Sequence, residues 1–196
     1  MNITIRRRTD SFRIATLEQV ISCKVQEKLS TVKTLSFESL LDGDIARIND
    51  TDAYVVEYDE DFYDVAKVKK ALKRGLYQIS IDCEHVSYRL TTEAETVNNF
   101  SYTGTPRQIL TQLLIGTEFH VGNVEPIEVA TFSITSEMTC RAAILSYAAS
   151  MGYDVEFEDF YVHIYAHRGD TQPKELVERN VVSISKSVSK VDSSRS

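Results

Sequence analysis

The sequence predicts an α+β protein with a β-rich first half and a mixed second half. Up to about residue 95, short apolar or alternating runs are separated by polar turn residues, as in the strands of a sheet. From about residue 100, two stretches show the 3.6-residue apolar period of helices, and strand patterns accompany them. We therefore divide the chain into a β-rich domain over residues 1–95, an α+β domain over residues 96–178 and a last segment over residues 179–196.

Composition and charge exclude several classes of function. The chain has 196 residues, of which 42% are hydrophobic, and a formal net charge of −7. This acidic balance argues against general nucleic-acid binding, which needs a basic surface; the one basic run, Arg6-Arg7-Arg8, is interpreted as a solvated end. Three cysteines without CxxC spacing, together with a polar N-terminus, predict reduced thiols in a protein made inside a cell. No apolar run approaches the roughly 20 residues that a membrane span needs.

The β-rich half contains a series of expected strands. Turn residues such as the Asp-Gly-Asp at 42–44 separate them. The last two strands are expected to form a hairpin, joined by a longer loop that contains lysines, arginine and Gly75. In order, the expected strands cover residues 34–38, 54–58, 62–68 and 77–83.

The last of these strands ends in Cys83-Glu84-His85, a sequence that invites interpretation as a catalytic or metal-binding cluster. Apolar residues occupy odd positions up to Cys83 and even positions from Val86 onward. A period-2 pattern cannot change phase without an extra residue, so we expect a bulge or bend at Glu84–His85. Adjacent strand residues point to opposite faces, and Cys83 and Glu84 therefore converge only if the bend brings them together. We predict a structural strand bend formed by Cys83, Glu84, His85 and Tyr88.

Two helices are expected in the second half. The first has Thr105 as N-cap, Pro106 at its first position and Gly116 as its C-terminal stop. The second is expected to run from a cap at Thr135 or Ser136 to Gly152. Its apolar stripe has helical spacing and consists of Cys140, Ala143, Ile144, Tyr147, Ala148 and Met151.

The rest of the second half is expected to contain strands and loops. A loop at 119–126 precedes a strand at 129–135, and residues 153–167 alternate like a hairpin with Glu158-Asp159 at its turn. A last strand is expected at 181–189, followed by a polar tail.

No residue set in the sequence predicts a metal or cofactor site. His163 and His167 lie four residues apart on an expected strand, which separates them by about 13 Å. Cys83 and His85 provide only two ligands, whereas a structural zinc site needs four.

The sequence does not predict a catalytic site either. Cys83 and Cys140 lie on apolar faces, where a buried neutral thiol is the commoner state. The acidic groups Glu158-Asp159 and Asp59-Glu60-Asp61 lie at expected turns, where carboxylates are solvated. The Arg-Gly-Asp at 168–170 is short enough to recur by chance. Nucleotide-binding glycine loops and the nucleophile elbow are missing from the sequence, so we predict no catalytic residue.

Several motifs, taken in order, nevertheless resemble a known family. They are ISIDCEHVSYRL, TGTPRQILTQLLIGTEFHVG, TFSITSEMTCRAAILSYAASMGYDVEFEDFYVHI, and HRGD followed by a polar segment with Asn180. Over roughly residues 54–190, this series resembles the tail-associated proteins, also called prophage endopeptidase tail proteins, of the baseplate hub of long-tailed phages (siphophages).

The resemblance implies a structural virion protein without a cofactor. It implies that the N-terminal strands form a tube-like antiparallel β-barrel or sandwich, with a small α+β domain of two helices packed on strands. Copies of the ring-forming region would close the distal end of the tail tube beneath the distal tail protein and beside other baseplate proteins. The tape-measure protein and phage DNA would pass through the channel during DNA ejection, without sequence-specific binding. Such a protein is made in the host bacterial cytoplasm and resides at the tail tip of the virion.

The chain departs from this family in length. Ring-forming regions of the family are nearly twice as long and carry two barrel domains, whereas here residues 179–196 either return to the one barrel or begin a second. The self-assembly expected is therefore a ring of three or of six copies. A cell-wall hydrolase (endopeptidase) associated with the tail tip, as the family name suggests, is the alternative function, and a monomeric adhesin or accessory module is a third.

Overall fold

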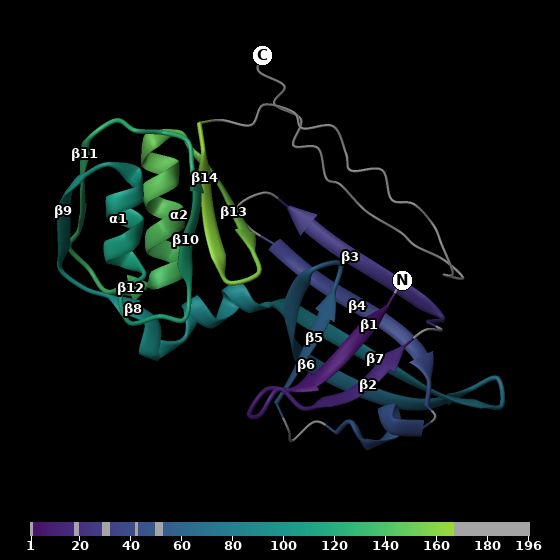
Figure 1. Ribbon diagram of the computed structural model, residues 1–196. Coiled ribbons are helices and arrows are strands. Elements are labelled where there is room, and N and C mark those ends of the chain that lie inside the picture. Colours follow the sequence, from purple (N-terminus) through teal and green to yellow (C-terminus); the bar gives the residue numbers. More distant parts are fainter. Residues whose placement is uncertain (1, 18–19, 29–31, 42, 50–52, 167–196) are drawn as a thin grey trace, which may run out of the picture. The chain divides into compact units, whose positions relative to one another are not determined.

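The computed structural model describes residues 2–17, 20–28, 32–41, 43–49 and 53–166. These residues form two compact units that divide between His85 and Val86 (Figure 1). The strand predicted at 181–189, the segment 179–196, His167 and the Arg-Gly-Asp at 168–170 lie outside the described residues. Within the described part, no helix is both long and apolar enough to cross a membrane.

The first unit is one antiparallel sheet of seven strands, curled into a half-barrel (Figure 1). The strands follow the order β2-β1-β5-β6-β7-β4-β3, so β2 and β3 form the two edges. Together with the helices of the second unit, this sheet confirms the predicted α+β class. The elements are β1 (Ile3–Arg7), β2 (Arg13–Leu17), β3 (Ser22–Lys28), β4 (Val32–Leu40), the 3-10 helix η1 (Gly43–Arg47), β5 (Tyr54–Tyr58), β6 (Asp61–Lys73) and β7 (Leu76–His85).

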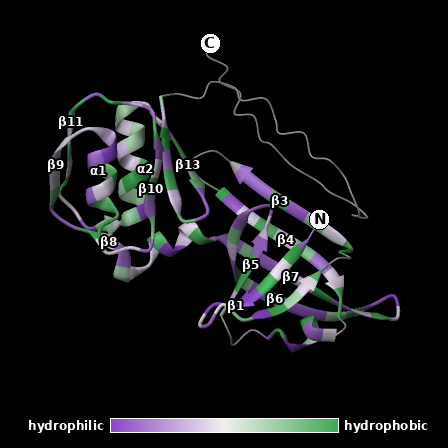
Figure 2. Ribbon diagram, in the orientation of Figure 1, coloured by the Kyte–Doolittle hydropathy of each residue, from purple (hydrophilic) through white to green (hydrophobic). Residues whose placement is uncertain are grey.

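The core of the first unit follows the period-2 pattern of its strands. Along β7, Ile79, Ile81 and Cys83 are buried, and the alternate residues are more exposed. Figure 2 shows hydrophobic and hydrophilic bands alternating along these strands. Strands β1 and β4 contribute further apolar residues to the same core, among them Ile5 and Phe37, which are also buried. The concave face of the curled sheet therefore encloses one hydrophobic core.

The hairpin between β6 and β7 differs from the prediction, because a two-residue turn replaces the longer loop. Strand pairing continues to Lys73 opposite Leu76, and only Arg74 and Gly75 lie outside it. Both turn residues have positive φ, 52° and 78°, as the tight turns that match strand twist require. The lysine-rich stretch looked like a loop because its side chains are exposed, whereas its backbone is fully paired along the hairpin.

The phase change after Cys83 marks the end of a strand. Strand β7 stops at His85, and the 3-10 helix η2 (Val86–Thr91) begins at the next residue. The register irregularity lies on the opposite strand, between Val65 and Lys67 of β6, where Val65 faces Cys83. The extra residue thus sits in β6 rather than in β7.

The second unit places two helices between a two-stranded ribbon and a three-stranded sheet (Figure 1). The ribbon pairs β9 with β11, and the sheet has the order β10-β14-β13; a further short pair joins β8 to β12. After η2, the elements are the 3-10 helix η3 (Glu93–Glu95), β8 (Thr96–Val97), β9 (Phe100–Gly104), α1 (Pro106–Leu113), β10 (His120–Val124), β11 (Ala130–Ile134), β12 (Met138–Thr139), α2 (Cys140–Met151), β13 (Asp154–Glu158) and β14 (Tyr161–Tyr165).

Helix α1 starts at a capping box. The Thr105 side chain accepts a hydrogen bond from the Gln108 N–H, and the Gln108 side chain accepts one from the Thr105 N–H. Pro106 follows as the first helical residue. The helix ends at Leu113 with Leu114 as its C-cap, and Gly116 lies two residues beyond with a φ of 86°. Gly116 therefore belongs to the turn after the helix.

Helix α2 begins later than predicted. Its N-cap is Thr139, whose hydroxyl accepts a hydrogen bond from the Ala142 N–H, rather than Thr135 or Ser136. The intervening Met138 and Thr139 pair with β8, and this pairing keeps their backbone extended. At the other end, Gly152 is the C-cap in the left-handed conformation, with a φ of 70°.

Strand β10 replaces the loop predicted at 119–126. It pairs in parallel with β14, and the register shifts between Val121 and Val124. Gly122 and Asn123 resemble loop residues in sequence, but here they form the bulge, and the Asn123 N–H donates to Nδ1 of His163 at 3.0 Å. A strand whose partner lies forty residues away leaves little local signal in the sequence.

Replacing Gly122 by alanine is expected to destabilise the second unit by about 1–3 kcal/mol. A Cβ at this position would lie 2.6 Å from the His163 ring, closer than van der Waals contact permits. Chemical denaturation followed by circular dichroism measures the loss. Adding His163→Ala to Gly122→Ala should recover part of it, and a Gly122→Ala chain as stable as the original would contradict the close approach.

Candidate functional site

The end of β7 contains a buried ionic cluster. The Nε2 atom of His85 lies 2.8 Å from Oδ1 of Asp61, the first residue of β6. Lys33 on β4 forms an ion pair with the other carboxylate oxygen of Asp61. His85 is 0% and Asp61 6% exposed. Asp61 was expected to be a solvated turn residue with Asp59 and Glu60, and this expectation is wrong: Asp61 faces the interior and joins three strands.

The electrostatics of this cluster favour an ionised Asp61. Burial raises the pKa of the Asp61 carboxyl, but the hydrogen bond and charge of His85 and the charge of Lys33 outweigh burial and lower it to about 2. Tyr63 packs edge-on against the His85 imidazole, with ring centroids 5.6 Å apart. Burial, followed by the nearby Asp61 charge, raises the pKa of Tyr63. Asp61 therefore holds the imidazole in a closed, aromatic-lined environment.

The cysteines lack the surroundings of a nucleophile. All three are free and buried. Burial raises the pKa of Cys83 well above its usual range and that of Cys140 to about 12, which opposes formation of the reactive thiolate. In the Cys83-Glu84-His85 sequence, Cys83 and His85 face the core while Glu84 is exposed, and His85 is bound to Asp61. Cys83, Glu84 and His85 thus terminate a strand, and they do not converge on a common point.

The remaining predicted site residues are scattered over the second unit. Tyr88 lies on η2, where its ring contacts Arg141. His163 lies on β14, and its Nε2 atom is 3.7 Å from a carboxylate oxygen of the exposed Glu158. Among the described residues, no group of three or more His, Cys, Asp or Glu side chains is arranged to hold a metal ion.

Arg141 is a residue that the sequence analysis missed. It lies in the first turn of α2 and is only 7% exposed. Its guanidinium carbon lies 4.5 Å from the ring centroid of Tyr88 and 4.9 Å from that of Phe157. Because an arginine next to Cys140 falls outside the apolar stripe, the helical pattern gave no sign of it. It joins η2, α2 and β13 within the second unit.

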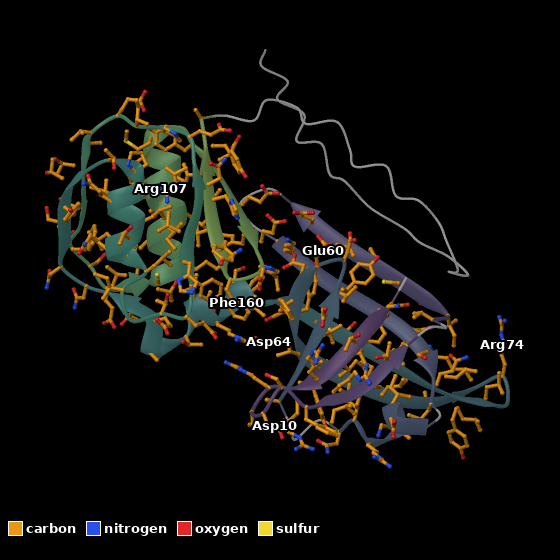
Figure 3. The ribbon with its side chains drawn as sticks, viewed as in Figure 1. Asp10, Glu60, Asp64, Arg74, Arg107 and Phe160 are labelled. Carbon is orange, nitrogen blue, oxygen red and sulfur yellow. The ribbon has the colours of Figure 1, made fainter. Side chains whose placement is uncertain are left out.

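The first unit presents two surfaces suited to assembly. The sheet is open, and strands β2 and β3 each have a partner on one side only within the described residues. The β6–β7 hairpin extends beyond its neighbours, since β5 pairs with β6 only up to Asp64 and β4 reaches Gln78 of β7. Near its tip, Leu72, Leu76 and Tyr77 are 60%, 54% and 64% exposed. We call these tip residues the hairpin arm (Figure 3, beside Arg74).

Phage tail proteins of known structure share this fold. Prophage tail protein gp18 from Listeria monocytogenes EGD-e aligns with a TM-score of 0.65 and 11% identity, covering 84% of this chain and 50% of its own. The tail protein from Neisseria meningitidis MC58 aligns with a TM-score of 0.59 and 11% identity, and the alignment covers 83% of this chain and 49% of that protein. The 43 kDa tail protein of prophage MuSo2 from Shewanella oneidensis aligns with a TM-score of 0.51 and 14% identity, and the alignment covers 84% of this chain and 52% of that protein.

At these identities the likeness concerns the fold alone. This chain spans about half the length of each of the three structures. No protein-family model matches it, and no curated protein does.

Proposed function

We propose that this chain is a structural component of a phage tail, a tail-tip or baseplate hub subunit that assembles as a closed ring of three or six copies. The observation that carries the proposal is the open, curled sheet with the fold of phage tail proteins. An unpaired strand edge is a template for pairing with another chain, and ring closure removes such edges. The ring would close the distal end of the tail tube and leave a channel for DNA.

The buried chemistry of the described residues is consistent with a structural role. The raised pKa of Cys83 and the closed environment of His85 offer no accessible nucleophile or base in the predicted cluster. The net charge of −7 suits a channel through which DNA slides, because phosphate contacts with basic side chains would retard it. The proposed partners are the distal tail protein, other baseplate proteins and, during ejection, the tape-measure protein and DNA.

Assembly is tested by mass photometry over a range of concentrations, with negative-stain imaging of any large species. The expected result is a ring of three or six copies with a central hole. A chain that remains monomeric, also after addition of a distal tail protein, would contradict the proposal.

The hairpin arm provides a sharper prediction. Replacing Leu72 and Tyr77 together by serine is expected to raise the dissociation constant of the ring at least tenfold, because these exposed side chains lose apolar contact area. Their exposure means that the stability of the single subunit should change little. The matched control replaces Ile127 and Val129, exposed by 77% and 67% in the second unit, by serine. Equal effects of the two double variants would exclude a specific role for the hairpin arm.

A further inference from the structure

A pocket with three arginines lies at one end of β5 in the first unit. Its volume is about 230 Å³, which admits one or two side chains. Arg7 from β1, Arg13 from β2 and Arg47 from η1 line it, with Asp44 as the acidic lining residue. The predicted strand bend and the hairpin arm involve none of these residues. We call this cavity the arginine pocket.

The three guanidinium groups differ in how far they are neutralised. Arg7 pairs with Asp10 at 3.0 Å, and Arg47 pairs with Asp44 at 3.4 Å, both in solvent-exposed positions. No hydrogen bond or ion pair joins the side chain of Arg13 to another described residue. The site therefore retains positive charge, in a chain whose net charge is −7.

The arginine pocket also has an exposed aromatic wall. Phe12 is 61% exposed, and the Arg7 guanidinium carbon lies 5.9 Å from its ring centroid. The preceding Ser11 has a φ of 56°, an unfavourable conformation for a residue other than glycine. Two hydrogen bonds hold this turn: the Phe12 N–H donates to the Asp10 carboxylate at 3.0 Å, and the Arg7 N–H donates to the Phe12 carbonyl at 2.8 Å. A strained turn that fixes an apolar ring in solvent suggests a binding role.

The opposite end of β5 carries the complementary charge. Tyr54, the first residue of β5, lines the arginine pocket, whereas the last residue, Tyr58, leads into a turn formed by Asp59 and Glu60. Both turn residues are exposed and have positive φ, 53° and 65°. Given the rise per residue of a β-strand, the two ends of β5 are about 13 Å apart. Figure 3 shows Glu60 and Asp10 apart from each other in the first unit.

We propose that the arginine pocket binds the Asp59–Glu60 turn of a second copy of this chain. Guanidinium groups bind carboxylates in a forked geometry, and the Phe12 ring would cover the apolar stems of the bound side chains. Because the two surfaces lie at opposite ends of one strand, the contact is head-to-tail and can repeat from copy to copy. This inference rests on the proposed self-assembly and names one of its interfaces. The site's small net charge, two aspartates among three arginines, and the acidic chain disfavour a nucleic-acid ligand.

Charge reversal tests the contact in the full chain by sedimentation velocity from micromolar to several hundred micromolar. Arg13→Glu and Glu60→Arg are each expected to weaken self-association at least tenfold, since each brings like charges together. The chain with both changes should regain association within about threefold of the original, because attraction is restored with reversed polarity. An equimolar mixture of the two single variants should also associate, since every contact between unlike copies pairs opposite charges.

The controls are Lys67→Glu and Glu137→Arg, which make the same charge changes at exposed positions outside the pocket and the turn. If the Arg13→Glu and Glu60→Arg variants still form rings, this contact is overturned, whereas the proposal that the chain forms a ring is unaffected. An original chain that stays monomeric throughout would overturn both. A third outcome concerns phosphate. If the original chain binds inorganic phosphate or a 20-base-pair DNA duplex, and Arg13→Glu abolishes this binding but leaves self-association unchanged, the pocket is a phosphate site and the contact is overturned.

Discussion

Replacing Asp61 by asparagine is expected to lower the free energy of unfolding of the first unit by about 3 kcal/mol at pH 7. The change removes the carboxylate that pairs with both His85 and Lys33, and it leaves the half-buried Lys33 ammonium without its counter-charge and the buried His85 without its ionised partner. An amide of the same size fills the site, so a cavity makes no contribution. Urea denaturation followed by circular dichroism measures the loss, since the chain has no tryptophan.

The same carboxylate makes stability depend on acid pH. The pKa of Asp61 is about 2 in the folded chain and about 4 in an unfolded one. A lowered folded-state pKa means that the unfolded chain binds the proton more tightly, so acid favours unfolding. The contribution of Asp61 is complete above about pH 4 and is lost as the pH falls towards 2; it amounts to roughly 2 kcal/mol.

The dependence of the free energy of unfolding on pH separates this effect from general acid unfolding. Asp61→Asn should flatten the profile between pH 4 and pH 2 relative to the original chain. The control is Glu84→Gln, which removes an exposed carboxylate of β7 outside the proposed contact. Equal slopes for the original chain and Asp61→Asn would show that the folded and unfolded pKa values of Asp61 do not differ.

Local patterns in the sequence predicted those features that local chemistry determines. The alternation along β7, the N-cap at Thr105 and the left-handed Gly152 depend on residues close in the chain, and the α+β class follows from their periodicities. Features that depend on distant partners were mispredicted. Strand β10 exists because it pairs with β14, and Thr139 rather than Thr135 caps α2 because β12 pairs with β8.

Charged residues in the interior were the hardest to predict. An aspartate in an Asp-Glu-Asp turn is normally solvated, and only the three-dimensional position of His85 and Lys33 makes Asp61 a buried ion-pair partner. The arginine pocket draws on β1, β2, η1 and β5, so no single sequence window reveals it. The Arg6-Arg7-Arg8 run, interpreted as a solvated end, supplies one of its arginines.

Arg141→Ala is expected to destabilise the second unit by about 3 kcal/mol. The guanidinium lies between the Tyr88 and Phe157 rings, and each such contact contributes up to about 2 kcal/mol when desolvated. The shortened side chain also leaves a void between α2 and β13, which adds to the cost. Burial, the larger influence, lowers the pKa of Arg141, while the nearby Tyr88 raises it. Hydrogen exchange measured by mass spectrometry localises the loss to η2, α2 and β13.

A second variant distinguishes charge from packing at this position. Arg141→Met keeps most of the side-chain volume and removes the charge, so it should cost about 1 kcal/mol, less than alanine. Arg107→Met, on the exposed surface of α1, is the control: it loses one solvent-exposed hydrogen bond to the Gly122 carbonyl and should change stability by less than about 1 kcal/mol. If Arg141→Met stabilises the unit, the cost of burying the guanidinium exceeds the gain from the two rings. Arg141 would then be retained for a reason other than the stability of its own unit.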